Sequence, residues 1–140
     1  MKSLEQWFDE YAVSHQNPLN QLIHKVCVPT IMFSVLGLLW AANPMACYLF
    51  VAACFVFYAL LSVKLLLGMI VMTLPMLYVL TVMSYHLEVS LGLFIVAWIF
   101  QFYGHKVEGK KPSFFKDVQF LLIGPIWVLA FAYRKLGLSY

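Results

Sequence analysis

One short polar segment stands out in an otherwise apolar sequence, and its side chains could do chemistry. Residues 101–112 contain one imidazole, one carboxylate and three lysines. If His105 lies on a helix, Glu108 follows at i+3 on the same face, close enough for both side chains to address one ion. Two candidate ligands do not make a metal site. The pair is therefore a candidate half-site that needs partners from elsewhere in the chain.

A second polar segment, residues 15–24, could supply those partners. Asn17 followed by Pro18 is typical of a helix start, with asparagine as the N-cap and proline at the first helical position. On one unbroken helix His15 and His24 would point about half a turn apart, whereas a corner before Pro18 allows them to converge. Asn20 lies four residues before His24 and could orient its imidazole or a bound ligand.

The composition indicates an integral membrane protein. Of 140 residues, 64% are hydrophobic and only 11% are charged, against about 25% charged residues in soluble domains. Between Val26 and Tyr103 only Lys64 and Glu88 carry formal charges. The net charge of +3 is too small to indicate a nucleic-acid partner. The three cysteines lie in apolar segments and are interpreted as reduced packing residues.

We expect a single all-α integral membrane domain over residues 1–140. A capping-box pattern at Ser3 and apolar residues at helical spacing predict a short amphipathic helix in residues 1–16, lying in the membrane interface. Residues 104–117 are expected to form a cytoplasmic loop that carries the site, and residues 118–133 either a short fifth span or a re-entrant hairpin. Four transmembrane helices are predicted at 26–42, 45–63, 65–83 and 89–103. The fourth is shorter than the roughly 20 residues usually needed.

The distribution of basic residues predicts the topology. Alternating four spans from the N-terminus places every lysine before residue 118 on one side of the membrane. The positive-inside rule makes that side cytoplasmic. A returning hairpin would add Arg134 and Lys135 to the same side, which mildly favours the hairpin over a fifth crossing.

The same topology gathers most of the candidate ligands. It brings His15, His24 and His105 to the cytoplasmic face together with Glu108, and it leaves His86 on the other face. The cytoplasmic face therefore holds a candidate metal site. The alternative is that these histidines have only structural roles.

Two motifs resemble those of a known family. They read His15-x-Asn17-x-x-Asn20-x-x-x-His24-x-x-x-x-Pro29 and Gln101-x-x-Gly104-His105-x-x-Glu108-x-x-x-Pro112. In this order on a multi-span protein they resemble small membrane proteins long classed as a domain of unknown function, among them the fungal 2-hydroxy fatty acid dioxygenase of phytosphingosine degradation. The resemblance covers almost the whole chain. It implies an iron(II)-dependent dioxygenase that shortens a 2-hydroxy fatty acid by one carbon, an α-oxidation.

The resemblance also implies a ligand set for Fe(2+). His15, His24 and His105 match the family's histidines and would bind the metal. A 2-hydroxy acid would use two of six coordination positions and dioxygen a third, which leaves three for the protein, to be filled by the three histidines or by two histidines and Glu108. Glu108 would then be a fourth ligand or a partner that orients an imidazole.

The remaining polar residues of the motifs are candidates for binding and catalysis. Asn20 and Gln101 match polar positions of the family. Lys110 or Lys111 could hold the substrate carboxylate, while the apolar helices would take the acyl tail. The partners implied are therefore a 2-hydroxy fatty acid, dioxygen and membrane lipid.

Two other classes of function remain open. A different metal-dependent lipid enzyme, such as a hydroxylase or a zinc hydrolase, would use the same residues. A small membrane transporter or assembly factor predicts polar groups near the middle of the membrane, where the spans offer only a few serines and threonines. The oligomeric state is open, and the host membrane is a bacterial inner membrane or the endoplasmic reticulum.

Overall fold

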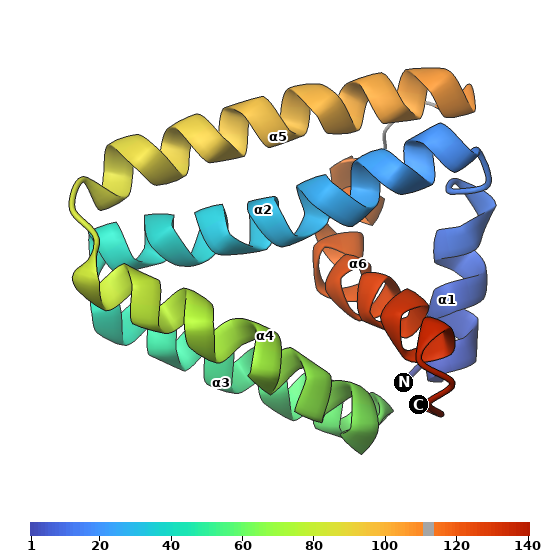
Figure 1. The fold of residues 1–140 in the computed structure, drawn as a ribbon, viewed down its shortest axis with the longest axis horizontal. Coiled ribbons are helices and arrows are strands. Elements are labelled where there is room, and N and C mark those ends of the chain that lie inside the picture. Colours follow the sequence, from blue (N-terminus) through green and yellow to red (C-terminus); the bar gives the residue numbers. More distant parts are fainter. Residues whose placement is uncertain (111–113) are drawn as a thin grey trace.

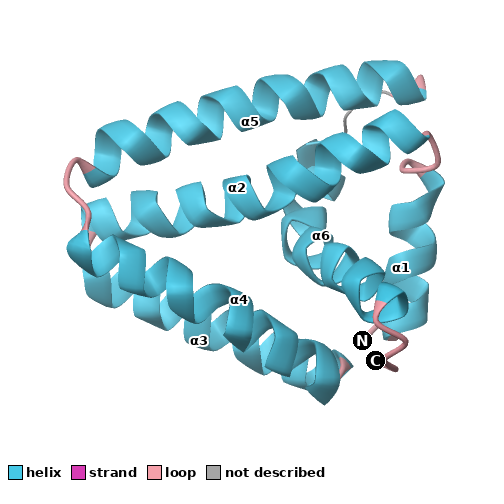
Figure 2. Ribbon diagram, in the orientation of Figure 1, coloured by secondary structure: helices cyan, strands magenta, loops and turns pink. Residues whose placement is uncertain are grey.

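Six helices and no strand make up the part of the chain that the computed structural model describes, residues 1–110 and 114–140 (Figure 1, Figure 2). They are α1 Leu4–Val13, α2 Pro18–Ala42, α3 Pro44–Leu61, α4 Val63–Val82, α5 His86–Glu108 and α6 Phe114–Lys135. The expected all-α architecture is therefore confirmed.

The long helices form two antiparallel pairs, α2 with α5 and α3 with α4. The pairs meet at one end of the molecule, where α2 gives way to α3 and α4 to α5, and diverge toward the other (Figure 1). At this second end, called the wide end below, α2 begins and α5 ends. There α1 runs from the start of α2 alongside α6, α6 lies between the two pairs, and both chain termini are found. The most extensive helix contact is between α2 and α5.

Short-range signals set most helix starts. The Ser3 hydroxyl accepts the N–H of Gln6 while the Gln6 side chain accepts the N–H of Ser3, which confirms the expected capping box. The Asn17 side chain accepts the N–H of Leu19 at 2.9 Å and starts α2 at Pro18, as expected. Asn43 both ends α2 and caps α3. The break expected at Lys64 falls two residues earlier, at the Ser62 cap of α4.

Around the candidate site the structure has one long helix, where the sequence predicted a short fourth span followed by a loop. α5 contains 23 residues and continues to Glu108, so the loop expected from residue 104 begins as helix. The helix ends at Gly109, whose left-handed φ of 74° lets its N–H bond back to the carbonyls of His105 and Lys106. Backbone hydrogen bonding, and not the loss of apolar residues, therefore sets the end of α5.

The re-entrant hairpin is not formed, because α6 is one helix that passes through Pro125. Side chains tie α6 to both helices of the second pair. Tyr58 donates a hydrogen bond to the Leu122 carbonyl at 2.8 Å, and Tyr133 donates to the Lys64 carbonyl at 2.5 Å. The C-terminal end of α6 thus lies beside the start of α4, where the hairpin was expected to bring it.

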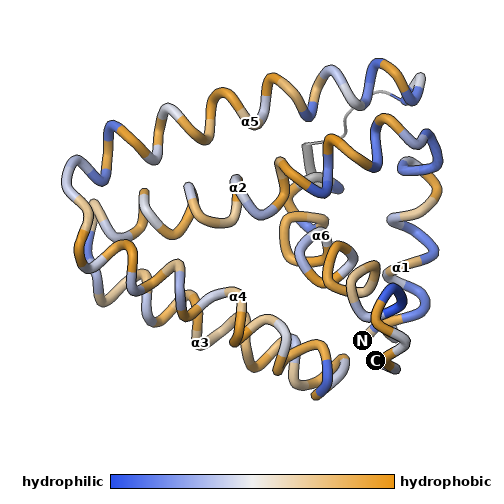
Figure 3. The backbone as a smooth tube through the Cα atoms, viewed as in Figure 1, coloured by the Kyte–Doolittle hydropathy of each residue, from blue (hydrophilic) through white to orange (hydrophobic). Residues whose placement is uncertain are grey.

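The surface is compatible with a multi-pass membrane protein. All helices except α1 include a segment long and apolar enough to cross a membrane, by length and composition. Large apolar side chains point outward from the second pair, with Val71 73% exposed and Tyr78 67% exposed. Polar residues concentrate on α1 and near the wide end of α2 and α5 (Figure 3). The cytoplasmic placement of this end stays a prediction.

The contact between α2 and α5 depends on Gly37, and replacing it with alanine is expected to lower stability. A Cβ at this position would lie 1.9 Å from Ser90 Oγ and 2.9 Å from Ser90 Cβ. We expect a loss of about 1–3 kcal/mol from overpacking, despite the better helix propensity of alanine. Gly92→Ala on α5 is the matched control, because a Cβ at Gly92 would meet nothing within 4 Å. Thermal unfolding in detergent compares the two variants, and equal effects would contradict this packing account.

Candidate functional site

Three of the four histidines converge at the wide end, as the topology led us to expect. His15 lies in the corner between α1 and α2, His24 in α2, and His105 near the end of α5. Their ring centres are 4.3 Å (His15–His24), 5.6 Å (His24–His105) and 6.0 Å (His15–His105) apart. All three are buried, with at most 7% of each exposed. His86 lies at the other end of α5, where its Nε2 donates to the Leu80 carbonyl.

Aromatic side chains from α1 and α6 surround His15. Its ring stacks on Tyr11 with the centres 3.9 Å apart and the planes 3° apart. The ring of Trp127 lies 4.8 Å from that of Tyr11 and 5.7 Å from that of His15. Burial lowers the pKa of the His15 imidazole to about 4, although its hydrogen bond to the Tyr11 carbonyl opposes this shift. The imidazole is therefore neutral at pH 7, the form that can bind a metal.

Backbone carbonyls fix the orientation of two imidazoles. Nδ1 of His15 lies 2.5 Å from the Tyr11 carbonyl oxygen, and Nδ1 of His24 lies 2.8 Å from the Asn20 carbonyl oxygen. Because a carbonyl only accepts, each Nδ1 carries the proton and donates it. The lone pair of each neutral ring then lies on Nε2. This arrangement, with one ring nitrogen held by the protein and the other left to a ligand, is typical of metal-binding histidines.

Glu108 braces the corner between α1 and α2 from α5. Its Oε1 accepts the N–H of Gln16 at 2.9 Å, and its Oε2 accepts the N–H of Asn17 at 2.8 Å. Oε2 also accepts from Nδ2 of Asn20 at 3.2 Å. The carboxylate thus satisfies backbone donors at the start of α2, where the helix dipole favours negative charge. None of these three hydrogen bonds goes to an imidazole, so the choice between the two roles expected for Glu108, fourth ligand or orienting partner, stays a prediction.

Close approach of α2 and α5 brings His105 to the other histidines. Asn20 is fully buried between the helices. A Cβ on Gly104 would lie 2.3 Å from Asn20 Oδ1 and 3.6 Å from Cε1 of His24. A side chain at position 104 would therefore require the buried Asn20 side chain to shift, whereas glycine leaves it room at the level of the site.

The donor set fits a metal ion that prefers imidazole, although the third ring stands slightly apart from the other two. With metal–nitrogen distances of about 2.0–2.1 Å, rings sharing one ion have centres about 4.5–5 Å apart. The His15–His24 distance of 4.3 Å is slightly shorter than this spacing, and the distances from His105 to His24 and His15, 5.6 and 6.0 Å, exceed it. Among the described residues, no group of three histidine, cysteine or acidic side chains already surrounds one point as ligands would.

Two amide oxygens at the site indicate a ligand that can donate hydrogen bonds. Asn20 Oδ1 and Gln101 Oε1 are buried and have no hydrogen-bond partner among the described residues. A buried acceptor without a partner carries a free-energy cost of about 1–3 kcal/mol. A hydroxyl group or a water molecule bound beside the histidines would remove that cost.

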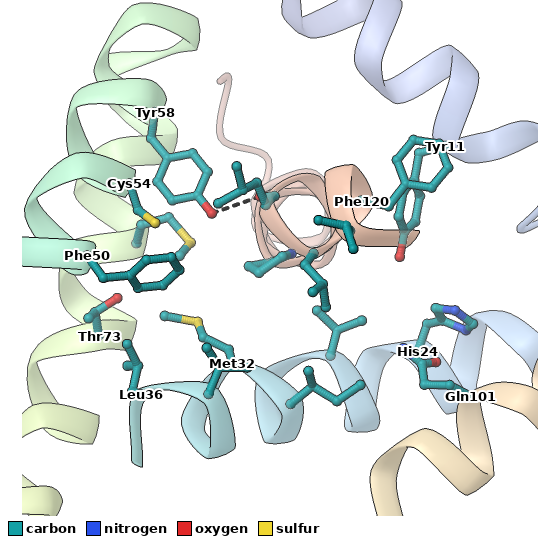
Figure 4. A pocket seen from close by; sticks show the side chains of 18 of the residues that line it. Tyr11, His24, Met32, Leu36, Phe50, Cys54, Tyr58, Thr73, Gln101 and Phe120 are labelled. Carbon is teal, nitrogen blue, oxygen red and sulfur yellow. Dashed lines mark hydrogen bonds between the residues drawn. The ribbon is translucent and has the colours of Figure 1, made fainter. Parts of the chain in front are cut away.

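A cavity of about 340 Å³ leads from the histidines into the apolar interior, between α2, α6 and the second pair (Figure 4). His24, Gln101 and Tyr11 lie at one end, and Phe50, Thr73 and Leu36 lie at the other. Its volume is near the lower end of the range of about 300–1,000 Å³ that ligand pockets occupy. A polar end and a long apolar remainder suit an amphipathic molecule with one polar head.

Of the two candidate lysines, Lys110 alone lies within the described residues. Lys110 follows the cap of α5, is exposed, and does not line the cavity. Lys111 lies outside the described residues. The structure therefore brings together the expected histidines, Glu108, Asn20 and Gln101, and it does not bring Lys110 to them.

For several residues at the site, the sequence analysis predicted no role there. Tyr11 had a visible signal, since it precedes His15 by four residues on one helical face, and Gly104 directly precedes His105 in its motif. No sequence pattern indicated that Trp127 would contact the rings of Tyr11 and His15, or that Thr73 would line the cavity, because α6 and α4 reach the site only through tertiary packing.

The fold and the site define an all-helical protein, compatible with multi-pass membrane insertion, in which a group of buried histidines faces an apolar cavity. The chain belongs to the Mpo1-like family. The family model, described as 2-hydroxy-palmitic acid dioxygenase Mpo1-like, matches residues 1–64 and 62–136.

A curated relative supports the same assignment. The chain is 33% identical over 135 residues to 2-hydroxy-palmitic acid dioxygenase MPO1 of Saccharomyces cerevisiae (strain ATCC 204508 / S288c), and the match covers 91% of this chain and 78% of the yeast protein. No solved structure matches the chain. The resemblance inferred from the two motifs is thus confirmed.

Proposed function

We propose that the protein is an iron(II)-dependent dioxygenase that shortens 2-hydroxy fatty acids by one carbon. The observation that carries the proposal is the convergence of three buried imidazoles at the polar end of an apolar cavity. Family membership and the name of the yeast relative support the use of dioxygen and a 2-hydroxy fatty acid substrate.

His15, His24 and His105 would hold the iron. Bound Fe(II) would supply a site for the hydroxyl and carboxylate of the substrate and activate dioxygen. The carbonyls of Tyr11 and Asn20 keep Nδ1 of two rings protonated and thereby present Nε2 to the ligand. Rigid placement of these rings reduces the reorganisation needed during reaction.

The other polar groups would position the substrate. The unpartnered oxygens of Asn20 and Gln101 can accept a hydrogen bond from the 2-hydroxyl group. The apolar lining would hold the acyl tail and exclude water from the head group. We further propose that Lys110, exposed beyond the end of α5, attracts the carboxylate from the membrane surface on the cytoplasmic side.

The test combines metal content with product analysis. Protein purified anaerobically in detergent and offered iron is expected to bind about one iron per three-imidazole site. With oxygen it should convert 2-hydroxypalmitic acid to the acid one carbon shorter, as detected by mass spectrometry. Palmitic acid, which lacks the 2-hydroxyl group, is the matched control and should not react. Zinc as the bound metal, without oxygen-dependent turnover, would contradict the proposal and favour a hydrolase.

A further inference from the structure

The cavity follows one face of α2 from the histidines inward. Its lining includes His24, Val28, Ile31, Val35 and Leu36, which recur at helical spacing along this face. From His24 to Leu36 the helix rises about 18 Å, at 1.5 Å per residue. This length is close to half the hydrocarbon thickness of about 30 Å of a bilayer, the depth that one layer of lipid tails fills. The cavity therefore has the length of one long-chain acyl group.

Side chains from three helices line the far end of the cavity. Thr73 of α4 is fully buried and lies between Leu36 of α2, which is 2% exposed, and Phe50 of α3, which is 40% exposed (Figure 4). Along the side of the cavity, the hydrogen bond from Tyr58 to the Leu122 carbonyl ties α3 to α6. The far end is thus lined by side chains from α2, α3 and α4, and none of the described lining residues there is charged.

We propose that Thr73, Phe50 and Leu36 form an end wall that sets the longest acyl chain the protein accepts. The proposal rests on the proposed function for the placement of the polar head at the histidines. With the head fixed there, the methyl end of the chain reaches the end wall. Chain-length selectivity then depends on the volume of these three side chains.

Thr73 is the small member of the wall, so enlarging it should shorten the accepted chain. Thr73→Phe adds about four non-hydrogen atoms at the far end of the cavity. We expect the preferred acid to become shorter, with a loss of about fourfold in affinity for each methylene that no longer fits. Thr81→Phe is the matched control, because Thr81 lies on the same helix but is exposed. It should leave the chain-length profile unchanged.

Two further variants separate size from other effects. Thr73→Val removes the buried hydroxyl, whose Oγ1 has no hydrogen-bond partner among the described residues, while keeping the shape. The range of accepted chain lengths should stay unchanged. A changed range would contradict the proposal that the end wall acts through side-chain volume. Phe50→Ala should extend the profile to longer acids. Because Phe50 is 40% exposed, its truncation tests the proposal even if Thr73→Phe fails to fold.

The measurement is the displacement of a fluorescent fatty acid by a homologous series of saturated 2-hydroxy acids, followed by turnover of the same series with iron and oxygen. A shorter optimum in Thr73→Phe and a longer one in Phe50→Ala, in both assays, is the expected result. Shifted binding profiles without turnover in any variant would reject the proposed reaction and retain the end wall. Normal turnover with the wild-type profile in both folded variants would reject the end wall and retain the reaction.

Discussion

Replacing His24 with alanine is expected to abolish iron binding and to lower the turnover of 2-hydroxypalmitic acid by more than about 100-fold. Mutation of groups that merely orient a ligand usually costs about 10–100-fold, so loss of a ligand should cost more. His24 is the most suitable of the three histidines, because it lies in the long helix α2 and is 2% exposed. Iron content by elemental analysis and product formation measure the effect.

His86→Ala is the control for this experiment. His86 is partly buried and bonded to the Leu80 carbonyl at the other end of α5, so its replacement removes an imidazole without touching the cluster. It should retain iron and activity. Circular dichroism and elution as a single species would show that both variants are folded. Retention of iron and turnover in folded His24→Ala would reject the assignment of His24 as a ligand.

Replacing Glu108 with glutamine is expected to weaken the site without removing it. The amide has one acceptor oxygen where the carboxylate has two, and its NH₂ group would face donors from Gln16, Asn17 or Asn20. We expect a loss of stability of about 1.5–3 kcal/mol and a loss of iron affinity of about 10–100-fold. Thermal unfolding and an iron titration followed by dialysis measure the two effects.

Glu88→Gln is the matched control, because Glu88 is exposed near the other end of α5. It should leave both the unfolding temperature and the iron affinity unchanged. An excess of iron should restore occupancy and turnover in Glu108→Gln, since all three imidazoles remain. If occupancy instead stayed as low as in His24→Ala, Glu108 would be a ligand and not a brace.

The structural elements predicted correctly are those whose formation depends on residues close together in the sequence. The capping box at Ser3 and the helix start at Pro18 require only neighbouring residues, and both formed as expected. The convergence of His15, His24 and His105 also followed from sequence. An alternating series of spans returns the chain to the same membrane face, whatever the details of packing.

The errors arose where hydrogen bonding or packing overrides composition. Polar residues from 104 onward predicted a loop, yet the helix continues, because a helix needs only its own backbone hydrogen bonds and a suitable cap, here Gly109. For residues 118–133 the sequence left a short fifth span and a hairpin open, and the structure decides against the hairpin, because α6 is continuous through Pro125. Hydrogen bonds from Tyr58 of α3 to α6, and from Tyr133 of α6 to α4, hold this helix in place.

The sequence by itself determined an apolar all-α chain and predicted that three histidines gather at one end of its long helices, because periodicity, caps and charge asymmetry act locally or along the chain. Only the tertiary structure decided that Glu108 braces the corner before α2, that Gly104 lets His105 approach His24, and that the cavity ends at Thr73. Each of these depends on contacts between residues far apart in sequence, such as the 92 positions separating Gln16 from Glu108. Such contacts follow from how the helices pack, and no local pattern encodes them.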